Sequence, residues 1–244
     1  MDGPEQATDE VRQMDVPVYN MTGDQVGSMT IDEGSLGGEV NPRLIKQAYV
    51  RYHSNRRQGS ARTRSRGQIK SSNKKLVRQK GSGRARHGNR TVAQFRGGGR
   101  AFAKTRTRED FRQSMPRKMR RQANRNAMLA KLIDGEVKVL ESLELSEPGT
   151  RRIVEALKAL GVDRSALVAV SSRVDRARNV QLSCRNMDEV RTCRAADLNC
   201  FEMLNNRYLV IAKEDLEAWL TGPSSQTDKG TRGDPMDARG EESQ

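Results

Sequence analysis

Residues 74–86 read KKLVRQKGSGRAR, and this stretch differs in kind from most of the chain. Six of the thirteen residues are Lys or Arg, two are Gly, and none is acidic. A segment with so much like charge and so little apolar surface repels itself and has nothing to bury. We therefore predict that it becomes ordered only where a partner supplies negative charge.

The region without acidic residues extends well beyond this stretch. From Val40 to Arg108 there is no Asp or Glu, but there are 21 Lys and Arg; the remainder of the 244 residues holds 24 bases and all 31 acids. A mildly acidic body thus carries one intensely basic insert, and the formal net charge is +14. This asymmetry points to a polyanionic partner. A membrane surface fits less well, because no amphipathic apolar face accompanies the bases.

The composition excludes several classes of protein. Hydrophobic residues make up 34% and aromatic residues 4% of the chain, so only part of it should pack into a core. Cys184, Cys193 and Cys200 are too few and too irregularly spaced for a disulfide framework. The N-terminus is acidic and polar, and no apolar run approaches the roughly 20 residues that span a bilayer. We expect a soluble cytoplasmic protein with disordered tails at 1–14 and 223–244.

The insert, at about residues 55–108, has no sustained apolar periodicity and is interrupted by glycines. Most of its bases are Arg, whose planar fork grips phosphate bidentately. Only Phe95 and Phe102 interleave with the bases, which disfavours a platform for stacking single-stranded bases. Recognition of the backbone and shape of folded RNA fits better. Two extended halves could each reach at most roughly 90 Å.

The flanking sequence predicts an α/β body. We expect two strands within 16–31, and a helix that Asn41 caps, that begins at Pro42 and that fades near His53. Further along, the expected order is helix 115–134, strand 137–145, helix 150–160, strand 165–172, helix 173–184, strand 208–213 and helix 214–220. This alternation predicts a three-layer, Rossmann-like mixed or parallel sheet flanked by helices. A single domain over 15–222 would carry the long extended basic loop.

Other interpretations of the insert, the glycines and the cysteines fit the sequence less well. A basic flexible linker or a nuclear localisation signal would not need Arg at this density over this length. Gly81–Gly83 and Gly97–Gly99 could cradle phosphates, but neither follows a buried strand or continues as a nucleotide-binding motif. The cysteines lack the spacing of zinc ligands, and we expect Cys184 and Cys200 to be buried structural thiols. No arrangement argues for catalysis, a metal or a cofactor.

The motifs of the insert resemble those of the bacterial large-subunit ribosomal protein L-four family. The string KKLVRQKGSGRARHG (74–88) is similar to the family signature, and RQG (57–59) and TRSR (63–66) resemble the segment that leads into its loop. FRGGGRAF (95–102) resembles the returning half, and PRKMR (116–120) the start of the next helix. One departure is Leu76-Val77, where the family usually has an aromatic pair.

The resemblance implies an α/β domain on the outer surface of the large ribosomal subunit, with a loop threaded into the large-subunit rRNA. The implied rRNA-binding residues are Arg56, Arg57, Arg62, Arg64, Arg66, Lys70, Lys74, Lys75, Arg78, Lys80, Arg84, Arg86, Arg90, Arg96, Arg100, Arg117, Lys118, Arg120 and Arg121. The implied loop tip at the peptide exit tunnel is Leu76, Val77, Arg78, Gln79, Lys80, Gly81, Ser82, Gly83 and Arg84. Implied partners are the rRNA, the L-twenty-two family protein and the nascent peptide, without a membrane or a homo-oligomer.

The sequence therefore predicts a structural, non-enzymatic constituent of the large subunit that supports early assembly. Two other classes stay open at this point. One is a free regulator that binds RNA or DNA transiently through a basic arm. The other is an enzyme with a Rossmann-like body and a basic substrate loop, which would require a nucleotide pocket.

Overall fold

A computed structural model describes residues 13–104, 111–171 and 174–222. It divides into two compact units, one formed by residues 1–50 and 115–244 and the other by residues 51–114. We call the described part of the first unit the body (13–50 and 115–222), and we call residues 57–104 of the second unit the arm. Each is described by itself. In the described ranges, every helix is too short or too polar to cross a membrane.

The body begins with the hairpin that the sequence predicts. Strands β1 (Gln13–Tyr19) and β2 (Gln25–Asp32) pair antiparallel. Between them, the Asn20 side chain accepts a hydrogen bond from the backbone N–H of Asp24 at 2.8 Å, and Gly23 adopts a φ of +92°. Such a tight turn requires a residue that tolerates positive φ, which explains the glycine.

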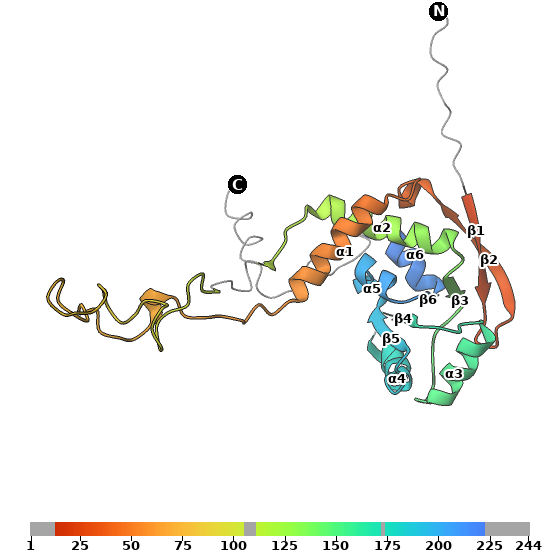
Figure 1. Cartoon of the computed structure of the whole chain (residues 1–244). Coiled ribbons are helices and arrows are strands. Elements are labelled where there is room, and N and C mark those ends of the chain that lie inside the picture. The colour runs from red at the N-terminus through yellow and green to blue at the C-terminus, as the bar shows by residue number, and fades with distance from the viewer. Residues whose placement is uncertain (1–12, 105–110, 172–173, 223–244) are drawn as a thin grey trace, which may run out of the picture. The chain divides into compact units, whose positions relative to one another are not determined.

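Six strands form one mixed sheet in the order β2-β1-β3-β6-β4-β5 (Figure 1). The four further strands are β3 (Val137–Leu140), β4 (Ala166–Val170), β5 (Val190–Arg194) and β6 (Tyr208–Ala212). All neighbouring pairs except β1–β2 are parallel. The predicted α/β class with a mixed sheet is confirmed.

Helices cover both faces of this sheet (Figure 1). On one face, Val168, Val170 and Val210 pack in a core cluster with residues of α3 (Thr150–Ala159) and α4 (Val174–Cys184). Because side chains alternate along a strand, Leu167 and Ile211 point to the opposite face. The other helices are α1 (Pro42–Arg56), α2 (Arg117–Ile133), α5 (Cys200–Asn205) and α6 (Lys213–Thr221).

Several details differ from the sequence prediction, among them the helix α5 (Cys200–Asn205), which it lacks. Strand β3 ends at Leu140 rather than at residue 145. The prediction was too long because Leu143, which is buried in the core cluster from a loop, continues the apolar pattern of the strand. Strand β5 was missed, because its residues are largely exposed and carry no apolar signal. Helix α1 begins at Pro42 as expected but ends at Arg56, beyond His53.

Buried polar side chains fix the position of α2 in the body. Asn126, which is 1% exposed, accepts a hydrogen bond from Asn41 N–H at 2.5 Å and donates to the carbonyls of Leu36 and Glu39 at 3.3 and 2.9 Å. Asn124, also 1% exposed, accepts from Cys200 N–H at 2.9 Å. These bonds join α2 to residues 36–41 and to Cys200 at the start of α5. They also satisfy the polar groups of the two amides, which buried amides require.

Candidate nucleic-acid interface

The arm consists of an outgoing and a returning segment connected by sparse backbone hydrogen bonds. Thr63 N–H donates to Lys104 O at 2.9 Å, Arg100 N–H to Arg64 O at 3.0 Å, and Leu76 N–H to Gly88 O at 2.9 Å. Between these points the two segments make no regular ladder. Each backbone therefore keeps many donors and acceptors available for another molecule.

One part of the arm is locally compact, and we call it the arm junction (residues 64–68 and 89–100). A short 3₁₀ turn at Arg66–Gln68 lies there, and Gly99 N–H donates to Thr91 O at 2.9 Å. A Cβ atom on Gly99 would lie 2.4 Å from Arg66 N, and one on Gly98 would lie 1.9 Å from Val92 O. Gly99 thus lies too close to the outgoing segment for a side chain, and Gly98 lies too close to the preceding turn of its own segment.

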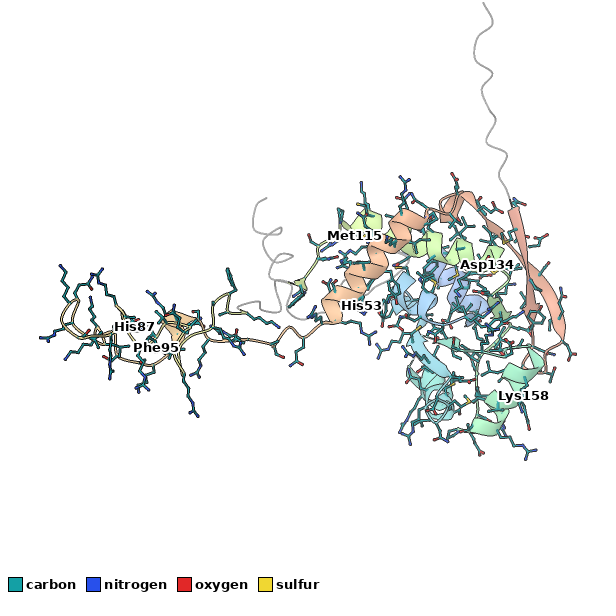
Figure 2. All side chains as sticks on the ribbon, in the orientation of Figure 1. His53, His87, Phe95, Met115, Asp134 and Lys158 are labelled. Atoms are coloured by element: carbon teal, nitrogen blue, oxygen red, sulfur yellow. The ribbon has the colours of Figure 1, made fainter. Side chains whose placement is uncertain are left out.

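Almost nothing else in the arm is buried. Thr91 is 2% exposed, and the only other buried position between residues 57 and 104 is Gly99. The aromatic rings of His87 and Phe95 meet edge-on with centroids 5.2 Å apart (Figure 2). Such a segment buries little apolar surface. Its ordered conformation is therefore only weakly stabilised by contacts within the arm.

The predicted basic residues of the insert share one property: all of them are exposed. They are Arg56, Arg57, Arg62, Arg64, Arg66, Lys70, Lys74, Lys75, Arg78, Lys80, Arg84, Arg86, Arg90, Arg96 and Arg100. Figure 2 shows long side chains along both segments of the arm, directed away from the backbone. Because the sequence has no Asp or Glu between Val40 and Arg108, no carboxylate of this stretch offsets their positive charge.

The predicted tip is a sequence of tight bends. Gly81 and Gly83 have φ values of +73° and +64°, and the Arg78 guanidinium donates to Gly81 O at 2.6 Å. Lys75 donates to the side chain of Gln79. Leu76 is 43% exposed, so the tip presents an apolar side chain among charged ones.

The four predicted basic residues at the start of α2 separate into two groups. Arg117, Lys118 and Arg121 are exposed, whereas Arg120 is only 8% exposed. Arg120 lies on the helix face that also buries Ala123 and Ala127. The sequence prediction did not take this helical periodicity into account, and Arg120 is less accessible than the other three predicted residues.

The sequence also missed a contact at the base of the arm. The Arg57 guanidinium lies 3.9 Å from the centre of the Phe111 ring, a cation–π geometry. Asn55 and Gln113 exchange two hydrogen bonds nearby, at 3.2 and 2.9 Å. The partners are more than fifty positions apart, so no local pattern could have paired them.

The cysteines show no sign of a reactive or metal-binding site. Among the described residues, His, Cys, Asp and Glu form no group of three that could hold a metal. Burial raises the pKa of Cys184 to about 11, and burial with the nearby Glu202 and Asp197 carboxylates raises the pKa of Cys193 to about 12. Thiolate is the nucleophilic form, so both thiols are inert near neutral pH.

These pKa values predict a specific pH dependence. In native protein at pH 8, iodoacetamide should label Cys184 and Cys193 far more slowly than in denaturant. An unfolded thiol loses its proton near pH 9, and the folded ones only near 11 to 12. Their contribution to stability is therefore complete below pH 9 and is lost as the pH rises toward 12. Mass spectrometry of labelled peptides checks the first point, and rapid native labelling at pH 8 would contradict it.

The class is defined by two features, a mixed α/β body and an insertion that is rich in Lys and Arg and contains no acidic residue between Val40 and Arg108. The profile of the family described as "Ribosomal protein L4/L1 family" matches residues 29–221. The chain belongs to this family, whose members are structural proteins of the ribosome and not enzymes.

Relatives of known name align with this chain along nearly their whole length. "Large ribosomal subunit protein uL4" of Dehalococcoides mccartyi (strain BAV1) is 41% identical over 201 residues, which cover 82% of this chain and 93% of the relative. The proteins of the same name from Symbiobacterium thermophilum and Thermoanaerobacter sp. (strain X514) are 40% and 37% identical over 199 residues, covering 82% of this chain and 94% of each relative.

Proposed function

We propose that this protein is a structural constituent of the large ribosomal subunit in the cytoplasm and that its arm binds large-subunit rRNA. The observation that carries the proposal is the arm itself: fifteen exposed bases between residues 56 and 100, no acid, and almost no core. Surrounding phosphate would supply both the counter-charge and the contacts that such a segment lacks. By this route the arm also supports early assembly, since it joins RNA segments that would otherwise repel each other.

The arm tip gives the proposal its second part. Residues 76–84 would line the peptide exit tunnel near its constriction, next to the L-twenty-two family protein and within reach of the nascent peptide. The bends at Gly81 and Gly83 and the exposed side chain of Leu76 support a compact, partly apolar tip. These residues and the family motif in which they stand are the basis for this assignment.

Co-sedimentation distinguishes this function from that of a free regulator. We expect the protein to remain with the large subunit at physiological salt and to dissociate only at much higher ionic strength. If the arm neutralises about ten phosphates, the logarithm of its affinity for isolated rRNA should fall with the logarithm of salt concentration with a slope of roughly −7 to −9. A protein that washes off the particle at physiological salt would instead be a transient regulator.

The arm junction allows a test with a single substitution. Gly99→Ala should weaken rRNA binding about tenfold, because the added methyl group forces the backbones of Ser65–Arg66 and Gly99 apart at a cost of ~1–3 kcal/mol. The thermal unfolding of the body should not change. Gly88→Ala is the matched control, because a Cβ there meets nothing within 4 Å. Equal affinities of the two variants in a filter-binding titration would refute this role of the junction.

A further inference from the structure

A basic cleft in the body lies outside the arm and contains Lys118 and Arg121, two of the predicted rRNA-binding residues. It has a volume of about 380 Å³ and is lined by the turn Gly34–Gly37, by Lys118, Arg121, Gln122 and Arg125 of α2, and by Gly222. Three of the lining side chains are cationic and none is acidic. A volume in this range accommodates a small ligand of nucleotide size.

The cleft is held open by buried contacts. Asn126, one position beyond Arg125, bonds to the carbonyls of Leu36 and Glu39 and so fixes the turn against α2. Gly37 adopts a φ of +109°, and a Cβ there would lie 2.7 Å from the Asn126 amide nitrogen. A side chain at position 37 would therefore displace the Asn126 amide that fixes this turn against α2.

The three cationic side chains of the cleft form a row along one face of α2. Lys118, Arg121 and Arg125 are spaced three and four positions apart, a span of about 10 Å along the helix axis. The Arg125 guanidinium donates to Ser35 O and to Gly222 O, both at 3.4 Å, which holds it at the far end of the cleft. Lys118 and Arg121 are exposed at the other end. A ribose with its flanking phosphates fits this extended row of donors.

The lining also limits what could be recognised. The N–H groups of Gly34 and Ser35 already donate to the Asp32 carboxylate at 2.9 and 3.1 Å, so the backbone of the turn is not an anion site. Among the residues that the structure describes, the lining contains no aromatic ring on which a base could stack. Recognition would therefore come from side chains and would be directed at the sugar-phosphate backbone.

We propose that this cleft holds the phosphate and ribose of one nucleotide of the bound RNA, independently of base identity. This rests on the proposed function, because the ligand belongs to the same RNA that the arm would contact. The cleft would add a second, pre-formed contact on the body, and Gln122 would complement the cations by hydrogen bonding to a ribose hydroxyl.

Two charge-matched double variants of the full chain test the cleft. Lys118→Gln with Arg121→Gln removes the exposed cations of the cleft, and Lys158→Gln with Arg164→Gln removes the same charge from exposed positions that do not line it. With a short oligouridylate, we expect the cleft variant to bind about fivefold more weakly than the control variant. Its salt slope should be shallower by about 0.7 for each lost phosphate contact. Equal binding by the two variants would overturn the inference.

Hydrogen exchange of the unmodified protein identifies the occupant. Oligouridylate should slow exchange in peptides that cover residues 33–38 and 117–126. Protection that is present without RNA and disappears when the chain ends at Gly222 would show that the chain's own C-terminal segment fills the cleft, against the proposal. Equal protection by inorganic phosphate alone would also contradict it, because the cleft would then hold a lone anion. If oligouridylate does not slow exchange in these peptides but the arm still binds RNA, the cleft proposal is refuted and the proposed function is not.

Discussion

A chain in which a short Gly-Ser linker replaces residues 60–100 is expected to lose incorporation into large ribosomal subunits. The deletion removes thirteen bases and no acid, which lowers the formal net charge from +14 to +1. Affinity for large-subunit rRNA should fall at least about 1000-fold at low salt, and the salt slope should shrink to about −1 to −3. Gradient sedimentation of subunits assembled with the variant measures the first effect, and filter binding measures the second.

Two comparisons separate the charge of the arm from other effects of the deletion. Replacing the same thirteen bases with Gln preserves the length of the arm and should impair binding as severely. Thermal unfolding of the body should be unchanged in both variants, because the six-stranded sheet and its helices lie outside the deleted residues. If either variant assembled into subunits like the unmodified chain, the arm would not be the RNA-binding element.

The second large effect is expected in the body, at Lys131. This side chain is 8% exposed, and its ammonium group donates to the Glu136 carboxylate at 2.5 Å and to the carbonyls of Asn206 and Arg207 at 2.9 and 2.6 Å. Lys131→Met removes all three bonds but keeps the apolar stem. We expect the free energy of unfolding to fall by about 2–4 kcal/mol and the midpoint by about 5–15 °C.

The partly exposed Glu136 limits this loss. Its other carboxylate oxygen lies 3.4 Å from Arg207 Nε, so the carboxylate keeps one cation when Lys131 is absent. Lys158→Met, at an exposed position of α3, is the matched control and should change stability by no more than about 0.5 kcal/mol. Calorimetric midpoints that do not differ between the two variants would show that the Lys131 network does not stabilise the body.

The sequence predicts the body well where apolar periodicity is strong. The helix predicted at 214–220 is α6, which buries Leu216 and Trp219, and the continuous apolar run 166–170 forms the fully buried strand β4. Strand β5 escaped prediction because its pairing with β4 depends on backbone bonds, which the side chains Arg191 and Arg194 do not signal. A pattern of side chains reports burial, and a sheet edge has little of it.

For the candidate interface, the sequence predicts which residues carry charge. It does not predict which residues far apart in the chain contact each other. The exposure of the fifteen bases follows from their charge alone, since burying them without partners would cost too much free energy. The contact between Gly99 and Arg66, the pair Arg57–Phe111, and the cleft at Lys118 and Arg121 all join segments that are far apart in the chain. Such contacts arise only when the chain folds.

Hydrogen exchange across residues 57–104, without and with large-subunit rRNA, is the most direct test of how the arm acquires its shape. We predict exchange within seconds in the purified protein freed of RNA, with slower exchange confined to the arm junction, and strong protection of both segments once rRNA is added. Uniform protection of the arm before any RNA is present would contradict the account, because a segment with almost no core would then hold its shape unaided.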